Sequence, residues 1–259
     1  MNDRVTLNVF DSIADVRLAR ADKMNAIDPA MFTAIGAVID ALAGRRDVRC
    51  VVLSGEGRGF CAGLDMASMA QGGSGMSTTR NAQGAIPPQH VTWGWRQLPM
   101  PVIAAVHGVA FGGGFQIMSG ADIRIAAPDT RFAIRETHWG LVPDMAGIAL
   151  WRTLARDDVL RELTYTAREF DGAEALHHGF VTRLDEDPHA AAMTMARAIA
   201  AKNPQAIRGS KALYTLAADA DSAAILRAES DAQGRVMRKP NQVEQVRANI
   251  EKRAAVFVD

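Results

Sequence analysis

Strand-like segments recur along the first half of this chain and stop near Ala146, and this switch of pattern constrains the fold most strongly. The segments are short apolar runs, or runs that alternate apolar with polar residues, as buried and half-buried strands do. They cover residues 5–9, 14–18, 50–53, 101–106, 122–127 and 131–134. The first two flank Asp11 and Ser12, a pair typical of a turn, so they predict an antiparallel hairpin.

Helical signals separate these strands and then replace them. Asp28 followed by Pro29 predicts a helix start, and the apolar stripe that follows ends at Gly44. The glycine triplet Gly112–Gly114 opens another helix that runs through Ser119. Further helices are expected at residues 146–155, 157–166, 172–178, 188–202, 204–217, 221–236 and 242–253. Expected N-cap residues among them are Asp171, Asn203 and Asn241. Strands joined by crossover helices indicate an α/β body, here followed by an alanine-rich helical tail that packs on the body or on neighbouring subunits.

Charge and composition narrow the classes of protein to which the chain can belong. Its 29 basic and 29 acidic side chains balance, which argues against nucleic-acid binding and against attachment to an anionic membrane. No apolar run reaches the roughly 18 residues of a membrane span, and the first residues lack the features of a secretory signal. Two cysteines are too few for a disulfide framework. A soluble cytoplasmic protein is therefore expected.

Residues 69–89 are rich in glycine and polar residues and show no periodicity. A connection of this length predicts either a mobile cover over a site or a disordered excursion.

Several common sites are excluded by their missing residues. Gly55–Phe60 resembles a dinucleotide fingerprint, but Phe60 stands where the third glycine is needed. No lysine follows Gly112–Gly114 as in a phosphate-binding loop, and no Gly-x-Ser-x-Gly elbow is present. The histidines have no metal-ligand spacing with cysteines or carboxylates, so neither a metal nor a separate cofactor is expected.

Two glycine-bearing segments that follow buried strands remain, residues 59–65 and 107–116. The glycine triplet exposes backbone N–H groups where a helix begins, and it lets a ligand approach the main chain. A second donor from residues 59–65 would complete a pair of amides around a developing oxyanion. Close packing of a helix on a strand also selects glycine, and that alternative stays open.

These segments carry a family resemblance together with two more motifs. Arg20–Ala26 lies upstream, and Phe132, Glu136 and the run Gly140–Pro143 lie downstream. With these motifs in this order, the whole chain resembles the crotonase (enoyl-CoA hydratase/isomerase) superfamily. The resemblance implies a spiral of repeated β-β-α units in residues 1–195 and a helical trimerisation region in residues 196–259. It also implies a homotrimer or a hexamer made of two trimers.

The resemblance further implies a substrate and its binding groups. Substrates of this superfamily are coenzyme A thioesters, so CoA would arrive as part of the substrate. The thioester oxygen would lie between the backbone N–H groups of Leu64 and Gly113. The family holds CoA largely through the main chain of two segments, and the matching residues here are Lys23, Met24, Ala26, Ala62, Gly63, Asp65 and Met66.

The acid and base groups set the reaction. Hydratases of the family use two glutamates, and the matching positions here hold Gln116 and Glu136. An amide cannot transfer a proton at neutral pH, so efficient hydration is doubtful. Asp144 stands where hydratases usually have glycine, and dienoyl-CoA isomerases resemble this chain at Glu136 and Asp144. Those isomerases carry an acidic residue where Gln116 stands, so the match is incomplete. By that resemblance, Asp144 would be the base at the α-carbon and Glu136 the distal acid.

Each of these residues also has a plain structural explanation. Asp144 could cap the helix expected near Ala146, and Glu136 could pair with Arg131 or Arg135. Gln116 could orient a carboxylate or a water, or have no role. The side chains that could line an acyl pocket or belong to the core are Met66, Met69, Trp93, Trp95 and Trp139.

Three functions therefore stay open. The first is isomerisation of an enoyl- or dienoyl-CoA. The second is hydration or another crotonase-type reaction such as thioester hydrolysis. The third is catalytically weak binding of acyl-CoA.

Overall fold

The computed structural model describes residues 3–70, 78–82 and 84–258. A six-stranded sheet forms its centre, with strand order β1-β2-β3-β4-β6-β8. β1 and β2 are antiparallel, and every other neighbouring pair in this sheet is parallel. Its strands are β1 (Val5–Phe10), β2 (Ile13–Leu18), β3 (Cys50–Gly55), β4 (Val102–Val106), β6 (Ile123–Ala126) and β8 (Arg183–Leu184). A small parallel sheet joins β5 (Val109–Phe111) to β7 (Arg131–Ala133).

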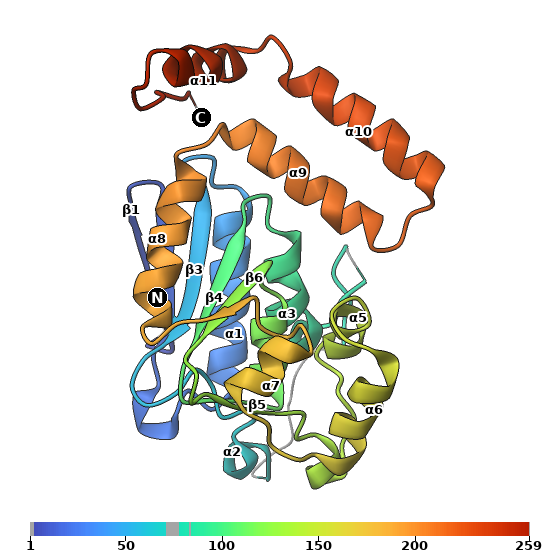
Figure 1. The fold of residues 1–259 in the computed structure, drawn as a ribbon. Coiled ribbons are helices and arrows are strands. Elements are labelled where there is room, and N and C mark those ends of the chain that lie inside the picture. Colours follow the sequence, from blue (N-terminus) through green and yellow to red (C-terminus); the bar gives the residue numbers. More distant parts are fainter. Residues whose placement is uncertain (1–2, 71–77, 83, 259) are drawn as a thin grey trace.

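Helices connect the strands and then form the rest of the chain (Figure 1). The helices before the last strands are α1 (Pro29–Ala43), α2 (Met66–Ala70), α3 (Pro87–Gln97) and α4 (Gly113–Ser119). The later ones are α5 (Gly147–Trp151), α6 (Asp157–Thr166), α7 (Gly172–His177), α8 (Pro188–Ala200), α9 (Pro204–Ala217), α10 (Ser222–Val236) and α11 (Pro240–Ile250). Two short 3-10 turns occupy Ala21–Lys23 and Thr137–Trp139. None of the helices in the described ranges is both long and apolar enough for a bilayer crossing.

Both faces of the central sheet are covered, as the apolar strand sequences require. Successive side chains of a strand point to opposite faces. In β3, Val51 and Leu53 therefore join the core under α1, α3 and α4, whereas Cys50 and Val52 face α8. Alanines such as Ala192 and Ala196 let α8 approach that second face closely.

The last three helices lie beyond one end of the sheet (Figure 1). None of the residues in α10 is buried. Large apolar side chains are exposed along this region, namely Tyr214, Leu216, Leu226, Met237, Val243, Val246, Ile250, Val256 and Val258. The expected division between residues 195 and 196 falls inside α8, which packs on the sheet.

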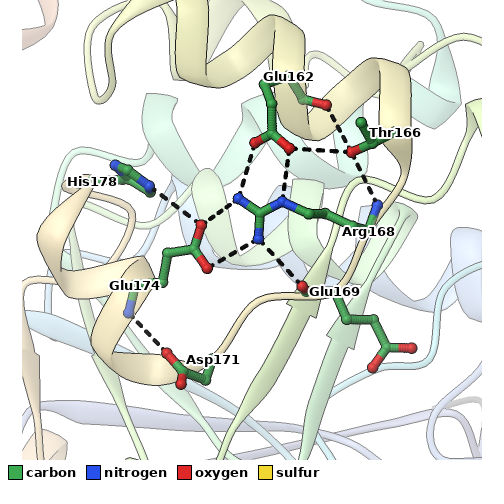
Figure 2. Close-up of polar contacts among 7 residues, drawn as sticks. All are labelled: Glu162, Thr166, Arg168, Glu169, Asp171, Glu174 and His178. Carbon is green, nitrogen blue, oxygen red and sulfur yellow. Dashed lines mark hydrogen bonds and ion pairs between the residues drawn. The ribbon is translucent and has the colours of Figure 1, made fainter.

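A surface ion-pair network joins α6 to α7 (Figure 2). The guanidinium of Arg168 lies between the carboxylates of Glu162 and Glu174. His178 approaches Glu174 from the opposite side at 3.4 Å. Next in the chain, Glu169 pairs with both Arg131 and Arg135, so this network adjoins the β7 segment.

Most of the expected elements are confirmed, and the differences have physical causes. Asp28, Asp171 and Asn203 cap their helices through their side chains. The expectation that Asn241 is an N-cap is wrong, because α11 begins earlier at Pro240 after Lys239. The side chain of Asn241 instead bridges Gln205 and the carbonyl of Val258, a tertiary contact that no local pattern reveals.

Four helices and strands were not expected, namely α2, α3, β5 and β8. α3 was missed because its apolar residues are few and are mixed with proline, glycine and polar residues. β5 has three residues and β8 has two, and a run this short carries no periodic signal. Of the aperiodic stretch at 69–89, residues 71–77 and 83 lie outside the described residues, so its interpretation as a cover or an excursion stays a prediction.

Candidate functional site

A cavity of about 260 Å³ opens between the two glycine-bearing segments and the chain that follows β7. The lining residues are Ala62, Gly63, Leu64, Met66, Phe111, Gly112, Gly113, Arg135, Glu136, Trp139 and Leu141. A buried carboxylate beside exposed main chain in a mostly apolar hollow is typical of a catalytic site.

Leu64 contributes a backbone N–H on the cavity side of its segment. Ile27 and Leu64 form an isolated parallel bridge. In this bridge Ile27 donates its N–H to the Gly63 carbonyl, and its carbonyl accepts from the N–H of Asp65. Successive backbone groups of an extended segment point in opposite directions, so the N–H of Leu64 points away from Ile27. Within the described ranges no hydrogen bond from this N–H to the protein is found.

Gly113 contributes the second N–H. It is the first residue of α4, where a helical N–H has no partner within the helix. A Cβ added to Gly63 would lie 3.7 Å from the Gly113 nitrogen, which places the two segments in contact. The arrangement offers two backbone donors to one electronegative atom in the cavity, as an oxyanion hole does.

Gly63 cannot be replaced without moving this pair. Its φ of +92° is unfavourable for a side chain, and an added Cβ would lie 2.7 Å from the Phe111 carbonyl oxygen. Close packing of the two segments and approach of a ligand to the main chain were alternative explanations of these glycines. Both explanations require the segments to be in contact, so they apply to the same residues.

Glu136 lies in the cavity wall and is only 6% exposed. Gln116 donates from Nε2 to Oε1 of Glu136 at 2.5 Å. Oε2 of Glu136 is buried and has no hydrogen-bond partner in the described part of the chain. One oxygen of this carboxyl group is thus held, and the other is left for a ligand.

The pKa values of both candidate carboxyl groups are raised. Burial is the main cause for Glu136. The backbone N–H groups of Glu136 and Arg135 and the Gln116 amide offset part of it, and the nearby charge of Asp144 adds to it. Partial desolvation raises the pKa of Asp144. Paired carboxyl groups with raised pKa values are suited to proton transfer near neutral pH.

The Arg20–Ala26 loop is fastened to the first glycine segment. Ala62 donates its N–H to the Met24 carbonyl at 2.9 Å. Arg20 pairs with Asp65 at 2.8 Å and donates to the Ala26 carbonyl. Hydrogen bonds from Arg20 and Ser68 hold the pKa of Asp65 below its usual value, so this ion pair persists over the ordinary pH range.

The cavity brings together part of the set expected from the sequence. Leu64, Gly113, Glu136, Ala62, Gly63, Met66 and Trp139 line it. Lys23, Met24, Ala26 and Asp65 lie on the adjoining loops, outside its wall. Gln116 is 0% exposed and stands behind Glu136, so its side chain supports the wall and does not form it. Asp144 is exposed and is not part of the lining, although its charge acts on Glu136.

The structure contradicts the plain structural explanations of Asp144 and Glu136 and confirms that Trp95 belongs to the core. Asp144 does not cap α5, because the first N–H of that helix, on Gly147, bonds to Oε1 of Gln116. Arg131 and Arg135 pair with Glu169, so Glu136 is not their partner. Trp95 belongs to the core and is fully buried, whereas Trp139 lines the cavity. The side chain of Met69 lies outside the described residues.

Sequence reasoning missed Phe111, Arg135 and Leu141 in the wall. Each is next to a motif residue, and position beside a motif was the only signal available. The guanidinium of Arg135 stacks over the Phe111 ring at 4.8 Å from its centroid, a contact between segments 24 residues apart that no local pattern indicates. In residues 3–70, 78–82 and 84–258 no group of three or more His, Cys, Asp or Glu side chains is placed to hold a metal ion.

Comparison with known proteins gives a consistent picture. The sequence profile of the family described as enoyl-CoA hydratase/isomerase matches residues 9–259. Delta(3,5)-Delta(2,4)-dienoyl-CoA isomerase of Mus musculus is 32% identical over 217 residues, which cover 77% of this chain and 64% of that protein. The chain thus matches less than two thirds of the length of that relative. Short-chain-enoyl-CoA hydratase of Clostridium acetobutylicum is 30% identical over 97% of this chain and 96% of its own length.

Solved structures agree with the fold. A candidate enoyl-CoA hydratase from Streptomyces coelicolor A3(2) has a TM-score of 0.91 at 32% identity, covering 100% of this chain and 95% of that chain. Enoyl-CoA hydratase from Bacillus anthracis has a TM-score of 0.89 at 26% identity, with 98% of each chain covered.

Proposed function

This chain belongs to the enoyl-CoA hydratase/isomerase family, and we propose that it moves double bonds in an enoyl- or dienoyl-CoA thioester. The observation that carries the proposal is the pair of N–H groups of Leu64 and Gly113, which have no hydrogen-bond partner among the described residues and lie in the same cavity as Glu136. Such a pair stabilises the charge that develops on a thioester oxygen when a neighbouring carbon loses a proton.

The proposed reaction is a proton shuttle. Asp144 removes a proton from the carbon next to the thioester, and the electron pair left behind moves onto the thioester oxygen between the two N–H groups. Glu136 then delivers a proton to a carbon further along the chain while the electrons return from the oxygen, so the double bond shifts and no atom is gained or lost. The raised pKa of Glu136 favours the protonated form that a donor needs.

The identity of residue 116 argues against efficient hydration. Hydratases of the family use a second glutamate at this position when they add water to a double bond. Gln116 is an amide and cannot transfer a proton. The hydratase from Clostridium acetobutylicum nevertheless matches almost the full chain, so hydration is the second candidate.

We also propose that α9–α11 form contacts between subunits of a homotrimer or of a hexamer. The exposed apolar side chains on these helices support this, because a patch of that kind commonly marks an interface. In this proposal residues 1–195 carry the acyl-CoA site and residues 196–259 carry the assembly contacts.

The test is a comparison of two substrates. Purified protein is given a 3,5-dienoyl-CoA and, separately, crotonyl-CoA, and the ultraviolet absorbance of each is followed. We expect turnover of the diene, with kcat reduced by about 10² to 10⁴ in Glu136→Gln and in Asp144→Asn.

Exposed carboxylates away from the cavity supply matched controls, and Asp129→Asn and Glu186→Gln should keep the wild-type rate. Fast hydration of crotonyl-CoA that is insensitive to Asp144→Asn would rule out the isomerase and favour the second candidate. Binding of a CoA thioester without turnover of either substrate would show that the protein is a binding module.

A further inference from the structure

Gln116 makes contact with two segments that the proposed chemistry needs. Its Nε2 donates to Oε1 of Glu136 at 2.5 Å. Its Oε1 accepts from the backbone N–H groups of Met145 at 3.0 Å and Gly147 at 2.9 Å. The residue is fully buried, so no water competes for these bonds.

The two backbone donors decide which way the amide of Gln116 points. An N–H can bond only to an acceptor, so the side-chain oxygen must face Met145 and Gly147. The NH₂ group must then face Glu136, and it can only donate. Oε1 of Glu136 is therefore an acceptor in every protonation state, and the neutral acid is favoured with its proton on Oε2, because a carbonyl oxygen accepts the Gln116 bond better than a hydroxyl oxygen does.

We propose that Gln116 is a positioning residue that confines the transferable proton of Glu136 to Oε2. This oxygen is buried without a partner in the described part of the chain, and Glu136 forms part of the cavity wall. Gln116 also fastens the backbone just after Asp144, so one side chain sets the placement of both candidate carboxyl groups. The inference rests on proton transfer by Glu136, as proposed above.

The charged neighbours of Glu136 do not hold its carboxyl group in place, whereas Gln116 does. Asp144 acts on Glu136 through its charge, and no hydrogen bond between the two carboxyl groups is found. Arg135 is the neighbour in the chain, and its guanidinium pairs with Glu169. Among the described residues, the contact from Gln116 is the one side-chain hydrogen bond to the Glu136 carboxyl group.

Two variants test the proposal. In Gln116→Glu one oxygen still accepts from Met145 and Gly147, but the other faces Oε1 of Glu136 and shares a proton with it. In Gln116→Met the volume is kept and both hydrogen-bonding functions are lost. We expect kcat to fall about 10- to 100-fold in each, as misplacement of a reacting group does, while KM stays near the wild-type value.

Two readouts separate positioning from a merely structural role. The alkaline side of the pH-rate profile should move to higher pH in Gln116→Glu, because two carboxyl groups that share a proton raise one apparent pKa and Glu136 must be protonated to act as the acid. Gln97→Glu, on the exposed end of α3, is the matched control and should leave the profile unchanged. Thermal unfolding of each variant shows whether it is folded.

A carbon-13 NMR titration of the Glu136 carboxyl group, assigned with Glu136→Gln, needs no turnover. If the wild type turns over neither substrate but this titration shifts in Gln116→Glu and Gln116→Met, the proposed reaction fails and the positioning role stands. If the wild type is active and both variants keep its kcat, pH profile and Glu136 titration, the positioning role is overturned.

Discussion

Cys61 and Ala110, 49 positions apart in the sequence, form an isolated parallel bridge next to the candidate site. The N–H of Cys61 bonds to the Val109 carbonyl at 3.0 Å, and the N–H of Phe111 bonds to the Cys61 carbonyl at 3.0 Å. Since each partner is followed within three residues by a donor of the candidate oxyanion hole, this bridge sets the distance between Leu64 and Gly113.

Gly114→Ala should destabilise the protein by about 1–3 kcal/mol, as overpacking does. The added Cβ would lie 2.4 Å from the Cys61 carbonyl oxygen and would force α4 away from the bridge. Urea unfolding measures the change. Gly36→Ala in α1 is the control, because its Cβ would meet nothing closer than 3.7 Å and should stabilise by about 0.5–1 kcal/mol. Equal stability of the two variants would contradict this prediction.

Asn25→Ala should cost about 2–4 kcal/mol, because it leaves several buried backbone groups without partners. Nδ2 of Asn25 donates to the carbonyls of Glu56, Gly59 and Phe60, and Oδ1 accepts from the Arg20 N–H. Loss of these bonds should also loosen the segment before Leu64 and reduce turnover. Asn8→Ala, at an exposed position of β1, should change neither quantity, and the same result for Asn25→Ala would refute the assigned role.

Glu136→Gln should reduce activity, and it should also remove one contribution to the pH dependence of stability. Since burial raises the pKa of Glu136, the folded state binds this proton more tightly than the unfolded state. The free energy of unfolding therefore falls as pH rises from about 4.3, the usual glutamate value, through the higher folded value. Thermal unfolding across this range should show a shallower decline in Glu136→Gln than in wild type. Parallel curves for the two proteins would show that this carboxyl group titrates normally.

Asp15→Asn should have the opposite effect at acid pH. Burial alone would raise the pKa of Asp15, but hydrogen bonds from His189 and Arg17 outweigh it and hold the pKa below the usual value. The resulting stability is present above about pH 3.9 and is lost as pH falls through the lower folded value. Acid unfolding of Asp15→Asn should lack this component. Asp11→Asn, in the exposed turn before β2, should unfold like the wild type.

Val246→Glu in α11 should reduce the oligomer to smaller species, because a charge would be buried in the proposed subunit contact. Sedimentation velocity measures the assembly directly. Tyr165→Glu, at a still more exposed position on α6, is the control and should keep the wild-type mass. An unchanged mass in both variants would place the subunit contacts elsewhere.

Local patterns were sufficient for most elements of the fold. A few neighbouring residues determine the helix caps at Asp28 and Asp171 and the apolar run of β3, so these features could be predicted. The backbone donors at Leu64 and Gly113 were also within reach, because glycine signals a close approach of the main chain wherever it follows a buried strand. α3 and β5 were missed since tertiary contacts, and no periodic pattern, stabilise them.

The sequence by itself determined that Glu136 is the carboxyl group and Gln116 the amide at this site, since residue identity sets which group can transfer a proton. Only the tertiary structure decided what each of them touches. The direction of the Gln116 amide depends on two N–H groups 29 and 31 positions away, and the raised pKa of Glu136 depends on burial by several segments. Hydrogen-bond partners and desolvation arise from distant parts of the chain meeting in space, so no local pattern contains them.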